Sequence, residues 1–321
     1  MKRAFVTGGS GFLGRKLIAT LVGRGVEVRA LSRSDRSDAA VTKAGATPVR
    51  GDLGDTDAMQ AGMTGCDVVF HAAAFVEEHG KLSEHMTITV DGTKSALIAA
   101  RAAGVPRFVH VGTEAVLADG NPIVQADETR PFPTHPAGPY PLTKGLAERA
   151  VVAANAPGFV TVGIRPRFIW GADDTSLLPK LVGAVKAKKF AWIGGGHYLT
   201  STCHVANVVE GALLAAEKGR GGEVYFLTDG EPVDFREFLT AMLATQGVDA
   251  GTKTVPRWVA KLVASLTSWM AKPPVTKQAF ALIGGEVTVV DKKARTELGY
   301  RGLVTRDAGL AEMRAAAAAS A

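Results

Sequence analysis

The stretch Thr7-Gly8-Gly9-Ser10-Gly11-Phe12-Leu13-Gly14 decides the fold of this chain. It follows an apolar-centred run at residues 2–7, which predicts a buried strand. It opens a segment, residues 12–21, in which apolar residues recur at helical spacing. The order of strand, glycine turn and helix is typical of a site for the pyrophosphate of a dinucleotide.

Each glycine of this stretch has a separate physical role. Gly8 supplies a tight turn, Gly11 lets the backbone approach a pyrophosphate closely, and Gly14 lets the helix pack tightly on the strand. The N–H groups of the first helical turn, which begins at Phe12 and Leu13, favour a bound anion. We therefore predict that Gly8, Gly11, Phe12, Leu13 and Gly14 contact the cofactor.

A second motif, Tyr140-Pro141-Leu142-Thr143-Lys144, lies near the middle of the chain. Residues four apart share one helix face, so Lys144 stands one turn from Tyr140. A nearby ammonium is expected to lower the tyrosine pKa from its usual value of about 10. Such a tyrosine can exchange a proton with a secondary alcohol while hydride moves between the alcohol carbon and a nicotinamide. The pattern is weak alone, but at this distance behind the glycine stretch it predicts a catalytic Tyr140 and Lys144.

Strand and helix patterns alternate through the first half of the chain. Strands are predicted at residues 2–7, 27–31, 47–50, 68–71, 107–111 and 161–165, and helices at 55–63, 83–103 and 140–154. This alternation predicts an α/β fold with a doubly wound parallel sheet of the Rossmann type, with ligands at the carboxyl ends of the strands.

The alternation is lost in two later segments, at about 171–200 and from about 230 onward. Residues about 201–229 read as a helix and a strand that return to the main domain. We therefore predict a dinucleotide-binding domain of residues 1–170 plus about 201–229, and a smaller discontinuous lobe of about 171–200 and 230–313. The alanine-rich tail, 314–321, is expected to be a frayed helix or a disordered end.

Composition agrees with a globular enzyme. A chain of 321 residues with 46% apolar residues can bury a large core. The net charge of +6 is modest and is spread along the chain, which argues against a nucleic-acid partner. Cys66 and Cys203 show no metal-ligand spacing and no disulfide framework. These features, with a strand directly at the amino terminus, predict a cytoplasmic protein without a metal site.

With these motifs the chain resembles the extended short-chain dehydrogenase/reductases of the NAD-dependent epimerase/dehydratase superfamily. Within them it is most similar to the 3β-hydroxysteroid dehydrogenase and sterol-4-carboxylate 3-dehydrogenase branch. Further matches are Gly51-Asp52-Leu53, Val69-Phe70-His71-Ala72-Ala73, Val90-Asp91-Gly92-Thr93, Arg165-Pro166-Arg167-Phe168-Ile169-Trp170-Gly171 and residues 222–232. The resemblance covers most of the chain.

The resemblance implies a third catalytic residue, Thr113, in the place of the family's serine. Its hydroxyl would orient the substrate carbonyl, with a turn or capping role as the alternative. Lys144 would also hydrogen-bond the nicotinamide ribose. Two positions depart from the family pattern: Glu114 has no assigned role, and Thr89 stands where an asparagine is common.

The end of the second predicted strand bears on the choice of dinucleotide. The resemblance places the ribose-binding position at Ser32, followed by Arg33, where no carboxylate competes for the ribose. NADP(H) is therefore favoured over NAD(H), with Arg33 on the phosphate, although Asp35 could still reach a ribose. The remaining cofactor contacts that the resemblance implies are Asp52 and Leu53 near the adenine, Ala72 and Ala73 in the wall, and Pro166 near the nicotinamide. A capping role is the alternative for Asp52.

The segment 255–271 is apolar at helical spacing and predicts a lid or wall of an apolar substrate pocket, with an interfacial membrane helix as the less favoured alternative. The favoured function is interconversion of a secondary alcohol and a ketone on a bulky apolar or amphipathic substrate, 3β-hydroxysteroid-like or 3-keto acid-like. The alternatives are a nucleotide-sugar epimerase or dehydratase with tightly held NAD, and a non-catalytic dinucleotide sensor. Family members are often homodimers built on helices that include residues 140–154.

Overall fold

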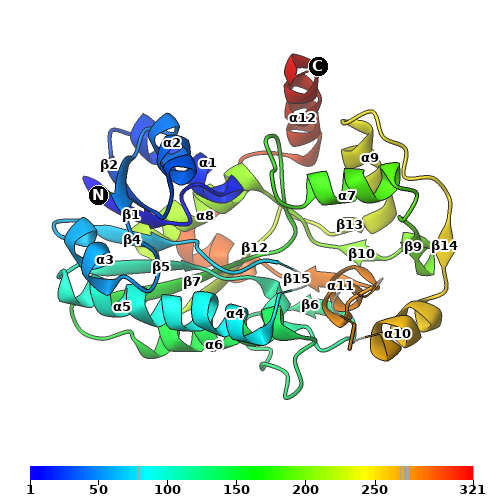
Figure 1. The fold of residues 1–321 in the computed structure, drawn as a ribbon, viewed down its shortest axis with the longest axis horizontal. Helices are drawn as coiled ribbons and strands as arrows, with labels where there is room; N and C mark the ends of the chain where they lie inside the picture. Colours follow the sequence, from blue (N-terminus) through cyan, green and yellow to red (C-terminus); the bar gives the residue numbers. More distant parts are fainter. Residues whose placement is uncertain (78–79, 268, 271–272, 274, 321) are drawn as a thin grey trace.

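A seven-stranded sheet forms the centre of the molecule (Figure 1). The structure is a computed structural model that describes residues 1–77, 80–267, 269–270, 273 and 275–320. The strands are β1 (Arg3–Thr7), β2 (Glu27–Ser32), β3 (Thr47–Arg50), β4 (Val68–His71), β5 (Arg107–Val111), β7 (Val160–Pro166) and β12 (Val224–Leu227). Their order is β12-β7-β5-β4-β1-β2-β3, and each neighbouring pair is parallel. The predicted doubly wound sheet is confirmed.

Helices cover both faces of this sheet, because successive strand residues point to opposite sides. Ala4 and Val6 of β1 pack with one set of helices, whereas Phe5 packs with the other. The first set is α1 (Phe12–Gly23), α2 (Asp35–Lys43) and α8 (Val205–Lys218). The second set is α3 (Thr56–Met63), α5 (Gly92–Ala102) and α6 (Pro139–Ala153). Each face of the sheet therefore has its own apolar core.

The predicted helix at 83–103 is present but is not uniform. It runs through α4 (Leu82–His85), a wider π-helical turn η1 (Met86–Asp91) and α5. A π turn inserts an extra residue into the helical ladder and is frequent at functional sites. Thr89 lies within this turn.

A smaller sheet lies beside the main one (Figure 1). Its strands are β6 (Ile123–Ala126), β10 (Leu199–Thr200), β13 (Val233–Asp234) and β15 (Val287–Val289), in the order β13-β10-β15-β6. Two short pairs accompany it: β8 (Ile169–Trp170) with β11 (Cys203–His204), and β9 (Trp192–Ile193) with β14 (Thr254–Val255). The helices of this region are α7 (Leu178–Lys186), α9 (Phe235–Ala244), α10 (Arg257–Leu266) and α11 (Lys277–Ile283).

The predicted return of the chain at about 201–229 is seen in α8 and β12, since β12 pairs with β7 at the edge of the main sheet. Between β5 and α6 come the 3₁₀ turn η2 (Glu114–Leu117) and β6. β6 pairs with β15 of the smaller sheet although it lies within the range expected for the main domain. The proposed division of the chain into two domains stays a prediction.

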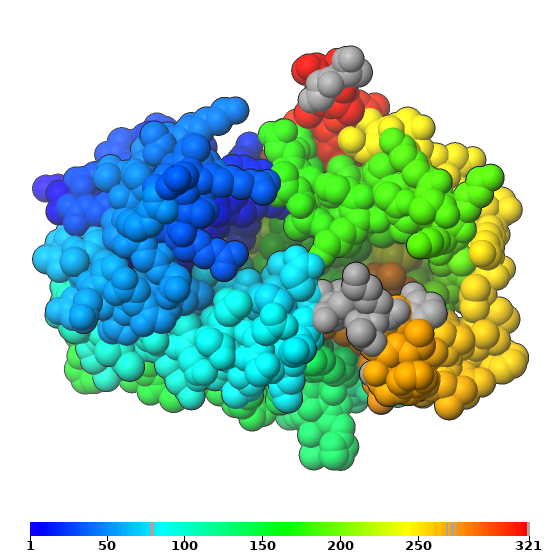
Figure 2. Space-filling model, in the orientation of Figure 1, coloured from blue at the N-terminus to red at the C-terminus, as the bar shows by residue number. Residues whose placement is uncertain are grey.

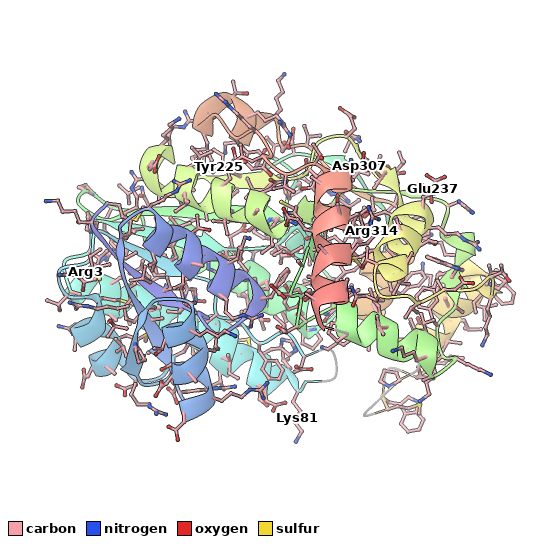
Figure 3. All side chains as sticks on the ribbon, turned by 90° about the horizontal axis from the view of Figure 1, so that it is seen from above. Arg3, Lys81, Tyr225, Glu237, Asp307 and Arg314 are labelled. Atoms are coloured by element: carbon pink, nitrogen blue, oxygen red, sulfur yellow. The ribbon has the colours of Figure 1, made fainter. Side chains whose placement is uncertain are left out.

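The alanine-rich end of the chain continues as helix α12 (Arg306–Ser320), and residue 321 lies outside the described residues. Met313 is buried in a cluster with side chains of α9, which anchors this helix. Figure 3 shows α12, with Asp307 and Arg314 labelled, standing beside α9. Of the two expectations for this tail, the helical one is observed.

Candidate active site

The glycine stretch forms a bare backbone loop pressed against the end of β4. Gly8 has a φ of +71°, and a Cβ added there would lie 2.7 Å from the nitrogen of Ala73. A Cβ added at Gly14 would lie 2.1 Å from the carbonyl oxygen of Gly8. A side chain at Gly8 or Gly14 would have no room, so this loop stays free of side chains. Its bare backbone fits a pyrophosphate held by the N–H groups at the start of α1. Figure 2 shows the molecule hollowed between the blue amino-terminal segments and the green segment near α7.

The motif residues Tyr140 and Lys144 lie one turn apart on α6. The Lys144 ammonium is buried and donates a 2.7 Å hydrogen bond to the carbonyl oxygen of Val111 at the end of β5. Burial lowers the pKa of Lys144 to about 8, against the opposing effect of the Glu148 carboxylate. The helix therefore brings a tyrosine and a readily deprotonated lysine to the carboxyl edge of the sheet.

The pKa of Tyr140 differs from the sequence-based expectation. Burial raises it above its usual value, the Glu114 charge adds to the rise, and a hydrogen bond with the Thr113 hydroxyl lowers it. The predicted lowering by Lys144 is therefore wrong for this structure. The reason is that the dominant influences on Tyr140 are burial and the nearby Glu114 carboxylate, which sequence spacing did not predict.

Thr113 joins the motif residues as the resemblance implied. It lies directly after β5 and contacts the Tyr140 hydroxyl. Its own hydroxyl donates a 2.8 Å hydrogen bond to Oε2 of Glu114 and accepts one from the N–H of Ala115 at 3.2 Å. Thr113 thus also caps the η2 turn, so both roles considered for it are compatible with its geometry.

Glu114 belongs to a buried ion pair that the sequence did not reveal. Its Oε1 lies 2.9 Å from Nη1 of Arg167, and both side chains are only 4% exposed. Arg167 also donates from Nη2 to the carbonyl oxygen of Leu282 at 2.7 Å and to the hydroxyl of Thr200 at 3.3 Å. The pair therefore connects the Thr113 end of the main sheet with α11 and the smaller sheet. The only sequence signal for this ion pair is that Glu114 and Arg167 are charged residues in apolar segments, where a buried charge needs a partner of opposite sign.

Two neutral histidines lie beneath the Lys144 ammonium. His71 and His110 stack with ring centroids 5.6 Å apart. Burial and, to a lesser degree, the charge of Lys144 together lower the pKa of His71 to about 3. Burial and Lys144 also hold the pKa of His110 well below its usual range. Lys144 is therefore the charged group of this cluster at neutral pH.

Thr89, which stands where the family commonly has asparagine, supports the loop beyond β4. Its hydroxyl accepts a 3.1 Å hydrogen bond from the N–H of Phe75, and its carbonyl accepts one from Thr93 at 2.6 Å. Thr93 in turn contacts Nε2 of His71 at 3.0 Å. The departure at residue 89 thus retains a polar link between η1 and the sheet edge.

His85, from the preceding turn, is a buried residue that the sequence analysis missed, and its ring centroid lies 6.5 Å from that of Tyr140.

At the adenine end, the carboxylates near the end of β2 are engaged with other side chains. Ser32 donates its hydroxyl to Asp38, and Arg50 pairs with both Asp35 and Asp38 at 2.5 Å. Arg33 is exposed and shows no side-chain partner among the residues described. Asp35, the residue that could still reach a ribose, is therefore held by Arg50.

Asp52 makes a turn contact rather than capping the following helix. Its Oδ1 accepts a 2.7 Å hydrogen bond from the N–H of Gly54. The cap of α3 is Asp55, which accepts from the N–H of Ala58 at 3.0 Å. Leu53 packs against the core beneath α3 and α5. The adenine contacts assigned to Asp52 and Leu53, and the nicotinamide contact assigned to Pro166, stay predictions.

Comparison with known proteins places this site in a family. The sequence profile of the 3-beta hydroxysteroid dehydrogenase/isomerase family matches residues 5–257. A Stigmatella aurantiaca protein named 4-hydroxy-2-methyl-3-oxo-4-farnesyl-3,4-dihydroquinoline-1-oxide ketoreductase is 53% identical over 98% of this chain and 96% of its own length. The chain belongs to the 3β-hydroxysteroid dehydrogenase/isomerase family. A Dictyostelium discoideum sterol-4-alpha-carboxylate 3-dehydrogenase, decarboxylating, is 32% identical over 98% of this chain and all of its own length.

Membership of the 3β-hydroxysteroid dehydrogenase/isomerase family makes the protein an oxidoreductase that uses a nicotinamide dinucleotide. The alternative of a non-catalytic sensor is thereby set aside. The fold is shared more widely: a dTDP-glucose 4,6-dehydratase from Streptomyces venezuelae, solved with NAD bound, aligns with a TM-score of 0.78 over 98% of this chain and 96% of its own. At 24% identity that likeness concerns the fold alone.

An apolar cavity of about 50 Å³ lies next to the segment that follows Arg167. It is lined by Phe168, Leu177, Leu181, Phe190, Ala191, Trp192, Ile193, Phe235, Leu239 and Ile283. Phe168 follows Arg167 in sequence, and Ile283 follows the Leu282 carbonyl that Arg167 binds. A larger hollow, about 480 Å³, lies between α12, residues 245–247 just after α9, and residues 172–178, and its lining includes none of the predicted site residues.

None of the described residues of the segment 255–271 lines this cavity, and the lid or wall of a substrate pocket expected there stays a prediction. Its helix α10 packs through Ala260 and Ala264, and turns Trp258 and Leu266 outward with exposed fractions of 70% and 64%. Small residues lie inward because the ring of Phe280 occupies the space beneath the helix. Residues 268 and 271 of this segment lie outside the described residues.

Among the described residues, no group of three or more His, Cys, Asp or Glu side chains could hold a metal ion. Within the same residues, no helix is both long enough and apolar enough to cross a bilayer. The expected homodimer and the cytoplasmic location stay predictions.

Proposed function

We propose that the protein is an NADP(H)-preferring ketoreductase that interconverts a ketone and a secondary alcohol on a bulky apolar substrate. The observation that carries this proposal is the contact of Tyr140 with Thr113, whose hydroxyl donates to Glu114, the ion-pair partner of Arg167. The lining of the apolar cavity begins at the next residue, Phe168. A proton donor linked in this way to an apolar region suits a substrate with one reacting oxygen and a large hydrocarbon part.

The apolar side chains near Arg167 support the substrate class. The cavity lining is dominated by aromatic and aliphatic residues; Phe168 follows Arg167 in the chain, and Ile283 follows Leu282, whose carbonyl Arg167 binds. The relative from Stigmatella aurantiaca is named for a farnesylated quinoline ketone, whose hydrocarbon chain matches this surface in polarity. We propose a ketone that carries a prenyl or alkyl chain, in preference to a sugar nucleotide.

The chain's own residues have distinct tasks in this mechanism. The bound dinucleotide supplies or accepts the hydride at the carbonyl carbon. Tyr140 donates its hydroxyl proton to the carbonyl oxygen as the alcohol forms, and takes it back in the reverse direction. Thr113 positions the Tyr140 hydroxyl and the substrate oxygen. The Lys144 ammonium, fixed on the Val111 carbonyl one helical turn along from Tyr140, holds positive charge for the predicted ribose position.

The preference for NADP(H) rests on the end of β2. A phosphorylated ribose needs a cation there, and Arg33 is exposed at that position. The competing carboxylates Asp35 and Asp38 both contact Arg50, which offsets part of their negative charge. NAD(H) remains the second choice. The position that would hold its ribose is Ser32, which offers no carboxylate and already donates its hydroxyl to Asp38.

The first experiment follows nicotinamide absorbance with purified protein, NADPH or NADH, and a panel of a farnesylated quinoline ketone, a 2-alkyl-3-keto acid, a hydroxysteroid and a UDP-sugar. We expect net NADPH oxidation by an apolar ketone. Tyr140→Phe should lower kcat about 100- to 10,000-fold while NADPH still binds, because only the proton donor is removed. Tyr225→Phe is the matched control, since its hydroxyl bonds Glu297 away from this site (Figure 3). Conversion of a UDP-sugar without net redox change would instead support the epimerase or dehydratase alternative.

The cofactor assignment is tested separately with Arg33→Ala. Loss of a charge-assisted hydrogen bond should raise the KM for NADPH about 10- to 100-fold and leave the KM for NADH nearly unchanged. Arg24→Ala, another exposed arginine at the end of α1, should change neither. Equal weakening of both cofactors would contradict the role given to Arg33.

A further inference from the structure

Helix α10 is packed in an unusual way for an amphipathic helix. Its smallest apolar residues, Ala260 and Ala264, are each 2% exposed and face the core, where they join Phe280. Its largest apolar residues face outward: Trp258, Leu262 and Leu266 are 70%, 49% and 64% exposed. A helix that serves only to cover a core buries its large side chains and exposes its small or polar ones.

The exposed residues form one continuous stripe. Trp258, Leu262 and Leu266 are spaced four residues apart, so they follow one face of the helix. Trp269 and Met270, just beyond the helix, are 84% and 39% exposed and extend the apolar surface. We call these five residues the α10 patch. Large exposed apolar patches mark contact sites for membranes or partners.

Positive charge surrounds the α10 patch. Residues 250–285 contain five Lys or Arg and no Asp or Glu. Among them Lys253, Arg257, Lys261 and Lys277 are exposed. Tryptophan and leucine flanked by basic residues are the composition of helices that lie in the interface of an anionic bilayer. This charge argues against a second copy as the occupant, because two such patches would bring like charges together.

The α10 patch is connected to the apolar cavity by short steps. Arg257, at the start of α10, donates a 2.7 Å hydrogen bond to the carbonyl oxygen of Gly284, next to the cavity residue Ile283. Ile193 lines the cavity and also packs in the cluster that holds Ala260 and Ala264. Figure 1 places α10 beside α11 at the rim of the molecule, and Figure 2 shows this orange region on the hollowed face.

We propose that the α10 patch docks on an anionic lipid surface, with Trp258, Leu262 and Leu266 inserted among the lipid headgroups and the basic residues around them on the phosphates. The protein then binds membranes peripherally, with the cavity side turned toward a bilayer in which an apolar substrate dissolves. This inference is independent of the ketoreductase assignment, because lipid binding is measured without substrate or cofactor.

The test is co-sedimentation of the purified full-length protein with vesicles of phosphatidylcholine alone or mixed with phosphatidylglycerol. We expect binding to the mixed vesicles that weakens as salt rises, since surface charge is screened. Tryptophan fluorescence should shift to shorter wavelength on binding, because Trp258 and Trp269 are exposed whereas Trp170 and Trp192 are already buried. Absence of binding to the mixed vesicles would overturn the proposal.

Variants locate the effect on the α10 patch. A triple variant, Trp258→Ser, Leu262→Ser and Leu266→Ser, should bind mixed vesicles at least about tenfold more weakly. Leu303→Ser is the matched control, because Leu303 is 64% exposed elsewhere and should leave binding unchanged. Equal binding by the triple variant and the wild type would refute the assignment. If the triple variant does not fold, Lys261→Glu should still lower affinity for mixed vesicles, and unchanged affinity would count against the proposal.

Self-association is measured on the same samples by analytical ultracentrifugation. The proposal expects that the triple variant and the wild type have the same oligomeric state without lipid. Assembly that depends on the α10 patch, together with no vesicle binding, would identify a second copy as the occupant and would overturn the membrane proposal.

Discussion

Two buried ion pairs involve arginines that are two residues apart at the end of β7, yet the surroundings of the two pairs differ. Arg165, in β7, pairs with Glu148, and Arg167, just after β7, pairs with Glu114. All four side chains are 4% exposed or less. Ion pairs this deeply buried contribute little net stability compared with an apolar core, so their position needs a further reason.

The first pair is enclosed within the main sheet and its helix. The guanidinium of Arg165 lies over the rings of Phe132 and Phe226, at 5.5 and 5.2 Å from their centroids. The second pair spans two parts of the molecule, because Arg167 also binds Leu282 and Glu114 accepts the Thr113 hydroxyl. The Arg165–Glu148 pair thus has its neighbours in the main sheet, in α6 and in the loop before α6. The Arg167–Glu114 pair instead links Thr113 to the smaller sheet and α11.

The two carboxylates also act on different residues of the site. Glu148 opposes the fall in the pKa of Lys144, whereas Glu114 adds to the rise in the pKa of Tyr140. Burial is the larger influence on both pKa values. One pair therefore adjusts the pKa of the lysine and the other adjusts the pKa of the tyrosine, so a Glu→Gln change in one pair is a matched control for the same change in the other.

The largest expected effect is on stability. Glu114→Gln and Glu148→Gln each leave a buried arginine without its charged partner, which should cost about 3–5 kcal/mol in the free energy of unfolding. Urea denaturation of the purified variants measures this loss. A much smaller cost for Glu114→Gln would show that Arg167 is stabilised by Leu282 and Thr200 alone, and would end the equivalence of the two pairs.

A somewhat smaller effect, of opposite sign, is expected for Lys144→Met. The pKa of Lys144 in the folded protein is about 8, below its usual value of 10.5, so the fold disfavours its charged form. This cost is fully present below pH 8 and disappears as pH rises through 10.5. At pH 7 the variant should therefore be more stable by up to about 3 kcal/mol, less about 1 kcal/mol for the unpaired Val111 carbonyl.

Urea unfolding at pH 7 and pH 10 checks this prediction, with the exposed Lys186→Met as control. The gain should shrink at the higher pH while turnover stays low at both. A loss of stability at pH 7 would show that the ammonium is better solvated than its burial implies. Stability gained where activity is lost is typical of a residue kept for function.

The main fold could be predicted because its signals are local. The glycine stretch, the apolar runs and the helical spacing each extend over a few neighbouring residues, and all six predicted strands are present with shifts of one residue at most. The smaller sheet could not be predicted, since strands such as β10 and β13 have only two residues each and depend on distant partners. No periodicity can be recognised in two residues.

The site was predictable where chemistry follows a motif and not where it depends on burial. Thr113 contacts Tyr140, and Lys144 lies one turn along the same helix, as the resemblance and the spacing implied, while their catalytic roles stay a prediction. The Glu114–Arg167 pair joins residues 53 positions apart, so no spacing rule could find it. For α10 the sequence showed an apolar stripe, but only packing against Phe280 decided that Ala260 and Ala264 would face inward.

The smallest expected effect distinguishes the two pairs most directly. In Glu114→Gln the carboxylate that raises the Tyr140 pKa is gone, so Tyr140 should ionise at lower pH than in the wild type. In Glu148→Gln the tyrosine should titrate as in the wild type, because Glu148 acts on Lys144. Ultraviolet difference titration, with Tyr140→Phe as the blank, measures this ionisation. Equal shifts in both variants would mean that the two pairs share one electrostatic environment, and that the second arginine–glutamate pair has no separate influence on the proton donor.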